Sequence, residues 1–183
     1  MSREFPDFVD PWKAADGRRT FQGTMPIRRM KRLEPLLAPE GDEAESETLV
    51  RGEADFIARF SYDRQGLVII RLGVNAELPL VCQRSLEPYR EPVSRRSVLA
   101  VIEDVSDQEE IPDAYEPVLV EHRRLALLDI VEEELLLAVP QVPRNPASAR
   151  VERSTDGQAA GAEEPRHKPF AGLAGLMTTK LKD

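Results

Sequence analysis

Residues 50–74, VRGEADFIARFSYDRQGLVIIRLGV, decide the fold of this 183-residue chain. In the first half, small or apolar residues at even positions from 50 to 60 alternate with mostly charged residues. A period of two is typical of a strand with one buried face. Residues 63–66, DRQG, have the composition of a turn, and residues 67–74 continue as a second, more apolar strand. The stretch therefore predicts a long β-hairpin.

The sequence on the carboxyl side of this hairpin predicts more sheet and then a helix. Residues 76–82 extend the second strand, and residues 93–102 and 118–120 have strand composition. Residues 125–139 place apolar side chains at helical spacing, with Asp129 and the run Glu132, Glu133 and Glu134 on the expected solvent edge. We predict an α+β fold: a mainly antiparallel sheet over residues 48–120, open or closed into a barrel, packed by this helix.

The two ends of the chain predict smaller elements. Asp10-Pro11 is a favourable helix start, residues 19–23 read as a short extended piece, and residues 26–37 have apolar residues at helical spacing. Residues 144–166 carry too little apolar surface to offset their ordering entropy, which predicts a flexible linker. Residues 167–183 predict a short amphipathic docking helix. We therefore expect one domain over residues 1–143, followed by the linker and this helix.

The net charge of −8 is unevenly distributed along the chain. Residues 1–32 hold eight basic and four acidic side chains, a balance of +4, whereas residues 103–134 hold twelve acids and two arginines, a balance of −10. A globally acidic protein binds nucleic acid poorly through non-specific attraction, but a segregated basic stretch can still contact phosphates. Two solvated faces of ordinary elements would give the same counts.

The sequence offers little catalytic chemistry. The single cysteine, Cys82, excludes an internal disulfide, and the two histidines, His122 and His167, stand in unlike contexts. Nucleophile-elbow, zinc-protease and phosphate-loop motifs are absent from the sequence. The first residues do not resemble a signal peptide, and no stretch approaches the ~20 apolar residues of a membrane helix. We expect a cytoplasmic protein that is not an enzyme and does not act at a membrane.

Several short motifs carry a resemblance to a known family. Residues 80–89 read LVCQRSLEPY, residues 111–118 read IPDAYEPV, and residues 128–143 read LDIVEEELLLAVPQVP. The ends add DPW at 10–12, FQG at 21–23 and KPFAGL at 168–173. In this order the motifs resemble the YceD family, the large ribosomal RNA subunit accumulation proteins of bacteria, over nearly the whole chain.

One difference from the family pattern concerns metal. Many members carry a second cysteine three positions after the first and another beyond the PxxP end of the helix, which hints at a metal site. Position 85 of this chain is Ser85, and no cysteine follows Pro143. Because one thiolate cannot hold a structural zinc ion, we expect no metal and no cofactor.

The resemblance implies a non-enzymatic role in the synthesis, processing or accumulation of 23S ribosomal RNA. The partner would be ribosomal RNA or the precursor of the large subunit. No catalytic residues of the family can be transferred to this chain. From the charge pattern, the candidate RNA-binding residues are Arg18, Arg19, Arg28, Arg29, Lys31, Arg32, Arg84, Arg95 and Arg96.

An alternative of a different class follows from the acidic half of the chain. An acidic surface can bind a basic large-subunit ribosomal protein and hold it until delivery, without direct RNA contact. The candidate residues for this contact are Glu109, Glu110, Glu132, Glu133 and Glu134. A third interpretation, an RNA-processing enzyme, would need Cys82 or a carboxylate as its reactive group.

Overall fold

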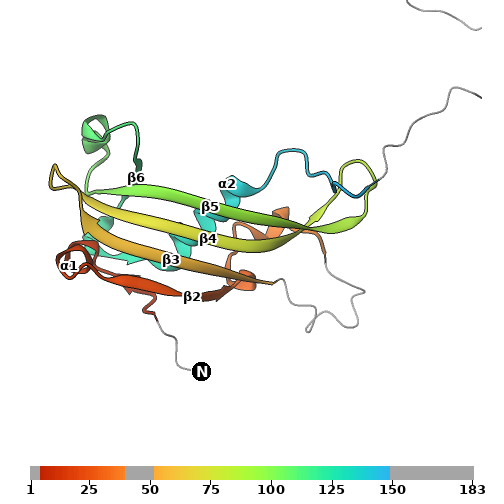
Figure 1. Ribbon diagram of the computed structural model, residues 1–183, viewed down its shortest axis with the longest axis horizontal. Helices are drawn as coiled ribbons and strands as arrows, with labels where there is room; N and C mark the ends of the chain where they lie inside the picture. The colour runs from red at the N-terminus through yellow and green to blue at the C-terminus, as the bar shows by residue number, and fades with distance from the viewer. Residues whose placement is uncertain (1–4, 40–51, 149–183) are drawn as a thin grey trace, which may run out of the picture. The chain divides into compact units, whose positions relative to one another are not determined.

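The computed structural model describes residues 5–39 and 52–148. The strands are β1 (Phe8–Val9), β2 (Thr20–Pro26), β3 (Glu53–Tyr62), β4 (Val68–Val81), β5 (Pro88–Ile102), β6 (Glu116–Leu119) and β7 (Leu125–Ala126). The helices are α1 (Pro11–Asp16) and α2 (Leu127–Ala138), with the 3-10 helices η1 (Ile27–Arg29), η2 (Glu34–Leu36), η3 (Val105–Glu110) and η4 (Glu121–Arg123). Figure 1 shows how they are arranged.

The predicted hairpin is confirmed as β3 and β4. The two strands pair antiparallel from Ala54 opposite Ala76 to Tyr62 opposite Val68. In the turn, the Asp63 carboxylate accepts hydrogen bonds from the backbone N–H groups of Gln65 and Leu67, at 2.8 and 2.9 Å. Gly66 has φ +86°, a conformation that side chains disfavour. These local bonds fix the register of the whole hairpin.

The hairpin lies at the centre of a five-stranded sheet with the order β2-β3-β4-β5-β6. All pairs are antiparallel except β5 with β6, which is parallel. The predicted α+β class with a mainly antiparallel sheet is confirmed. Among the described strands, β2 and β6 are the two edges of this sheet, so it is open there and is not a closed barrel.

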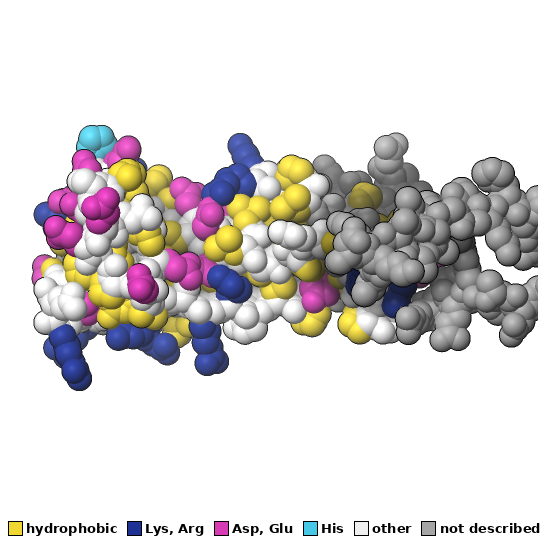
Figure 2. All heavy atoms as spheres, turned by 90° about the horizontal axis from the view of Figure 1, so that it is seen from above, with side chains coloured by type: hydrophobic (Ala, Val, Ile, Leu, Met, Phe, Trp, Pro, Cys, Tyr) yellow, Lys and Arg dark blue, Asp and Glu magenta, His cyan; other side chains and the backbone are white. Residues whose placement is uncertain are grey.

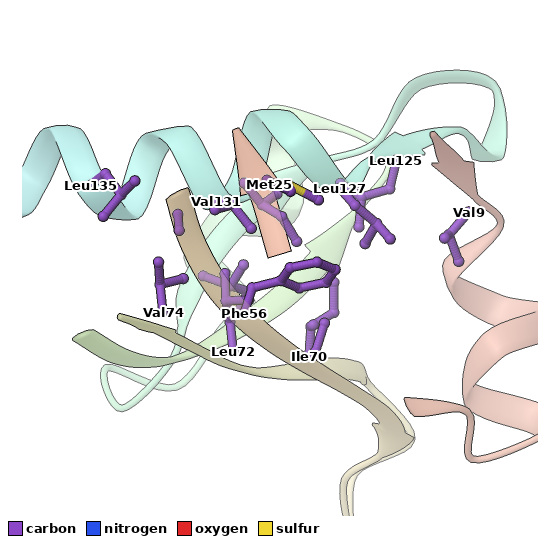
Figure 3. Close-up of a cluster of buried hydrophobic side chains, with 14 of the residues drawn as sticks. Val9, Met25, Phe56, Ile70, Leu72, Val74, Leu125, Leu127, Val131 and Leu135 are labelled. Carbon is purple, nitrogen blue, oxygen red and sulfur yellow. The ribbon is translucent and has the colours of Figure 1, made fainter. Parts of the chain in front are cut away.

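The core fills one face of the sheet. Phe56, Leu72 and Val74 point from β3 and β4 toward Val131 and Leu135 of α2, and all five side chains are buried (Figure 3). Because strand residues alternate between faces, Asp55, Arg59 and Arg71 lie on the opposite face. Helix α2 is behind the sheet in Figure 1, so this second face, called here the open face, is toward the viewer.

The segment after β2 differs from the predicted helix over residues 26–37. The chain instead forms η1 and η2, and buries Ile27, Met30 and Leu33. Two causes are visible. Pro35 cannot continue a helix from the preceding turn. The backbone N–H groups of Arg32 and Leu33 donate to the Glu132 carboxylate of α2 rather than to helical carbonyls.

Other boundaries also differ from the sequence prediction. Strand β5 begins at Pro88 rather than at residue 93, because its first half pairs with the far half of β4. The small β1–β7 sheet was not predicted. The Asp10 cap of α1 is confirmed, since its carboxylate accepts from the N–H groups of Trp12 and Lys13, both at 3.1 Å.

The carboxyl-terminal elements fall almost entirely outside the described residues. Of the predicted linker over residues 144–166, only residues 144–148 are described, and the predicted docking helix over residues 167–183 lies beyond them. Both, with the domain boundary at residue 143, stay predictions. None of the helices in the described part of the chain is long and apolar enough to cross a membrane.

Candidate nucleic-acid interface

Two of the three consecutive acids of α2 are not on a solvent edge, contrary to the sequence prediction. Glu132 is 5% exposed and Glu134 is 2% exposed. One Glu132 oxygen accepts the backbone N–H of Arg32 at 2.6 Å and that of Leu33 at 3.2 Å. A buried carboxylate is tolerated only when such donors satisfy it. Glu132 therefore holds the segment after β2 against α2.

Glu134 plays the same part between α2 and β5. Its Oε2 lies 3.1 Å from Nε of Arg95, and its Oε1 accepts the Ser97 hydroxyl. Arg95 is thus on the core side of β5, with its charge used inside the protein. The candidates Arg95 and Arg96, neighbours in sequence, point to opposite faces of the sheet because strand side chains alternate.

The amino-terminal basic residues divide into two groups. Arg29 lies 3.3 Å from the Asp7 carboxylate, and Arg32 lies 2.7 Å from the Glu133 carboxylate. Both are ion pairs at the surface, which leave the arginines partly accessible. Within the described part of the chain no ion pair involves four exposed basic residues: Arg18, Arg19, Arg28 and Lys31.

Arg84 lies with Cys82 at the turn between β4 and β5, where the chain segment after α2 packs. Its guanidinium donates to the Asn145 carbonyl at 3.3 Å and to the Ser148 side chain. The Asn145 N–H in turn donates to the buried Cys82 Sγ at 3.3 Å. The neighbouring Ser85 hydroxyl, and after it the N–H groups of Ser85 and Asn145, lower the pKa of Cys82 to about 6. Arg84 and Cys82 therefore fasten this segment to the sheet.

The open face carries two charged residues that the sequence analysis missed. Arg59 of β3 stands directly opposite Arg71 of β4 in the hairpin register. Arg96 of β5 is on the same face, opposite Gly73 of β4. The alternating pattern of β3 and the position of the DRQG turn were enough to predict that Arg59 faces Arg71, because the turn sets the register of the hairpin. Nothing in the sequence alone would have placed Arg96 beside them.

These three arginines border a shallow groove of about 640 Å³ on the open face. Ile57, Gly73 and Val98 also line it, and Glu116 of β6 is its one lining carboxylate. Figure 2 views the sheet edge-on from above, and Lys and Arg side chains project along its lower edge, which is the open-face side. Within the described residues, this is where the structure gathers basic side chains from three strands.

Acidic side chains gather at another place. Asp104 caps η3, and hydrogen bonds from the Ser106 backbone N–H and hydroxyl lower the pKa of its carboxyl group. Glu109 and Glu110, on the same 3-10 helix, are exposed. Figure 2 shows several acidic side chains gathered at the left end of the view. The candidate partner-binding set is therefore split, because Glu132 and Glu134 are buried in α2.

Comparison with known proteins gives the family. Residues 70–177 match the family model "Large ribosomal RNA subunit accumulation protein YceD". A Haemophilus influenzae protein of the same name is 32% identical over 178 residues, which cover 94% of this chain and 96% of that protein. The chain belongs to the YceD family. No solved structure matches it.

Membership of the YceD family agrees with the resemblance seen in the sequence motifs. It does not by itself identify the residues of the site. The YceD match begins at Ile70 in β4 and takes in β5, β6 and α2. Of the three open-face arginines, Arg71 and Arg96 fall inside it and Arg59 precedes it. The family name refers to the accumulation of an RNA and names no reaction. In the described residues, no three His, Cys, Asp or Glu side chains cluster as metal ligands.

Proposed function

We propose that this protein is a non-enzymatic factor in the synthesis, processing or accumulation of 23S ribosomal RNA during biogenesis of the large ribosomal subunit. The observation that carries the proposal is the similarity over 94% of the chain to a protein named for accumulation of large-subunit ribosomal RNA. The proposed partner is ribosomal RNA or the precursor particle of the large subunit, and the proposed place of action is the bacterial cytoplasm.

The distribution of accessible charge supports direct contact with RNA. Contact with phosphates requires arginine and lysine side chains that are not already neutralised inside the protein. Arg18, Arg28 and Lys31 meet this condition, as does Arg96 on the open face. Arg95 does not, because its guanidinium pairs with the buried Glu134 carboxylate. We therefore remove Arg95 from the proposed RNA contacts. Arg84 is exposed and bonds only the uncharged Asn145 and Ser148, so its charge remains available.

A non-enzymatic role fits the chemistry available in the described residues. Cys82 is buried and hydrogen-bonded in a structural turn. Glu132 and Glu134 are fully engaged by backbone, hydroxyl and guanidinium donors. A general acid or base must reach the reacting group, and these carboxylates do not reach the surface. The proposed activity is therefore binding rather than catalysis.

The alternative is an acidic adaptor that binds a basic ribosomal protein without touching RNA. Glu109 and Glu110 on η3 remain available for such a contact. The three candidate glutamates of α2 contribute less than the sequence suggested, because of these only Glu133 is exposed, and it pairs with Arg32. This loss of acidic surface favours the RNA hypothesis.

Titration of the purified full chain against in vitro transcribed large-subunit ribosomal RNA separates the two. We expect binding at low salt that weakens steeply as salt is raised, because phosphate contacts release counterions. A parallel titration uses basic proteins purified from the large subunit. Failure to bind the RNA at low salt, together with retained binding of a basic protein, would reject the RNA hypothesis in favour of the adaptor.

A further inference from the structure

The open face concentrates positive charge in an arrangement that costs stability. Arg59 and Arg71 are directly opposite on neighbouring antiparallel strands. Like charges in this position repel each other. Val98 of β5 is opposite Arg71, and Arg96 is two residues from Val98, on the same face and diagonal to Arg71.

Within the described part of the chain, none of these three arginines forms an ion pair with a carboxylate. Elsewhere Arg29, Arg32 and Arg95 are each paired with an acid, at 2.7 to 3.3 Å. By contrast, the side-chain hydrogen bond that this trio makes within residues 5–39 and 52–148 is from Arg71 to the Ser61 hydroxyl, at 3.1 Å. On the same face, Asp55 is the next acid along β3, and it accepts the Thr24 hydroxyl at 2.7 Å. The three guanidinium groups are thus available to an external anion.

The surface between the three arginines is hollowed and suits the close approach of a chain. Gly73 has no side chain, and a Cβ at that position would lie 3.2 Å from Cγ2 of Ile57. Ile57 and Val98 add apolar side chains to the lining of the groove, which the three arginines share. A nucleic acid backbone carries one anionic phosphate per nucleotide. A single strand that lies along the groove can therefore contact all three arginines.

The face also indicates how the nucleic acid would be recognised. The open-face positions of β2 to β5, such as Gln22, Ile57, Asn75 and Val98, carry no aromatic side chain among the described residues. Proteins that read single-stranded bases on a sheet stack them on aromatic rings. Contacts here would therefore be to phosphates, with little dependence on base sequence.

We propose that Arg59, Arg71 and Arg96 form an RNA-binding surface on the open face of the sheet, which holds the phosphate backbone independently of sequence. The inference rests on the proposed function, to which it adds the site and the mode of contact. The groove's single carboxylate, Glu116, comes from the edge strand β6 and bounds the positive surface on that side.

The test compares the salt dependence of RNA binding for the wild type and the variant Arg59→Gln/Arg71→Gln/Arg96→Gln. Each lost phosphate contact reduces the slope of log K against log salt by about 0.7 to 0.9, so the variant slope should be shallower by about 2 to 3. Between about 50 and 200 mM salt, wild-type affinity should fall ~20- to 40-fold more than that of the variant. Large-subunit RNA and an unrelated RNA of equal length should show the same change.

A control variant removes the same charge elsewhere: Lys13→Gln/Arg124→Gln/Arg144→Gln, three exposed positions away from the groove. Its slope should equal that of the wild type. The open-face variant should melt no lower than the wild type, because it relieves the repulsion between Arg59 and Arg71. Equal slopes for the open-face variant and the control would overturn the site assignment, as would a slope change found only in Arg18→Gln/Arg28→Gln/Lys31→Gln. In both cases the proposed function would stand. If the wild type binds no RNA, the proposed RNA contact itself fails.

Discussion

Replacement of Arg95 by methionine is expected to lower the free energy of unfolding by about 2 to 3 kcal/mol. The Glu134 side chain is 3% exposed, and Arg95 is its charged partner at 3.1 Å. Without the guanidinium, a buried carboxylate is left with the Ser97 hydroxyl alone. Breaking a fully buried ion pair costs ~3–5 kcal/mol, and the value here is smaller because about a third of Arg95 is exposed. Urea denaturation gives the difference directly.

The neighbouring residue supplies a matched control. Arg96→Met removes the same group from the opposite face, where no carboxylate partner is present among the described residues, and should change stability by less than about 0.5 kcal/mol. Equal losses for the two variants would show that the Arg95–Glu134 pair does not hold α2 to the sheet. A larger loss of stability for Arg95→Met than for Arg96→Met would also distinguish Arg95, which stabilises the fold, from Arg96, which we propose binds RNA.

The Cys82 thiol is expected to titrate with a midpoint near pH 6 in the folded protein, against about 8.5 in the unfolded chain. The first cause is the neighbouring Ser85 hydroxyl, with the N–H groups of Ser85 and Asn145 next. A folded-state pKa that lies below the unfolded value adds stability as pH rises from about 6 to 8.5, and adds none below about pH 6. Thiolate ultraviolet absorbance measured against pH reports the midpoint.

Two serine variants identify the cause of this shift. Ser85→Ala removes the hydroxyl that is the first cause of the lowered pKa and should move the midpoint upward, toward the ordinary thiol value. Ser148→Ala is the control: its hydroxyl lies 3.7 Å from Cys82 Sγ and is not a principal cause of the lowered pKa, so the midpoint should stay near 6. A wild-type midpoint above pH 8 would contradict the hydrogen-bonded geometry of this turn.

The sequence predicted those features whose determinants are local. The alternating pattern over residues 50–60 and the DRQG turn are sufficient to predict the hairpin of β3 and β4. Asp10-Pro11 is likewise sufficient to predict the N-terminus of α1. The predicted helix over residues 26–37 was wrong because its deciding contact is distant. Glu132, which takes the N–H groups of Arg32 and Leu33, is 100 and 99 residues away in the chain.

The same reasoning explains the outcome for the candidate site. Net charge identified basic segments, but it could not tell a paired arginine from an unpaired one. Arg95 and Arg96 look equivalent in sequence, and only the position of Glu134 distinguishes them. Arg59 was missed because it is isolated in a strand, although the hairpin register brings it to Arg71. A charge cluster assembled across strands does not appear as a run in the sequence.

The central claim is that the open face of the sheet contacts ribosomal RNA, and ultraviolet crosslinking tests it most directly. The full chain is crosslinked to large-subunit ribosomal RNA at low salt, and the peptides that carry nucleotide are identified by mass spectrometry. The account predicts crosslinks in β3, β4 and β5, at or beside Arg59, Arg71 and Arg96. Crosslinks confined to residues 18–32 or to α2, with none in these three strands, would contradict it.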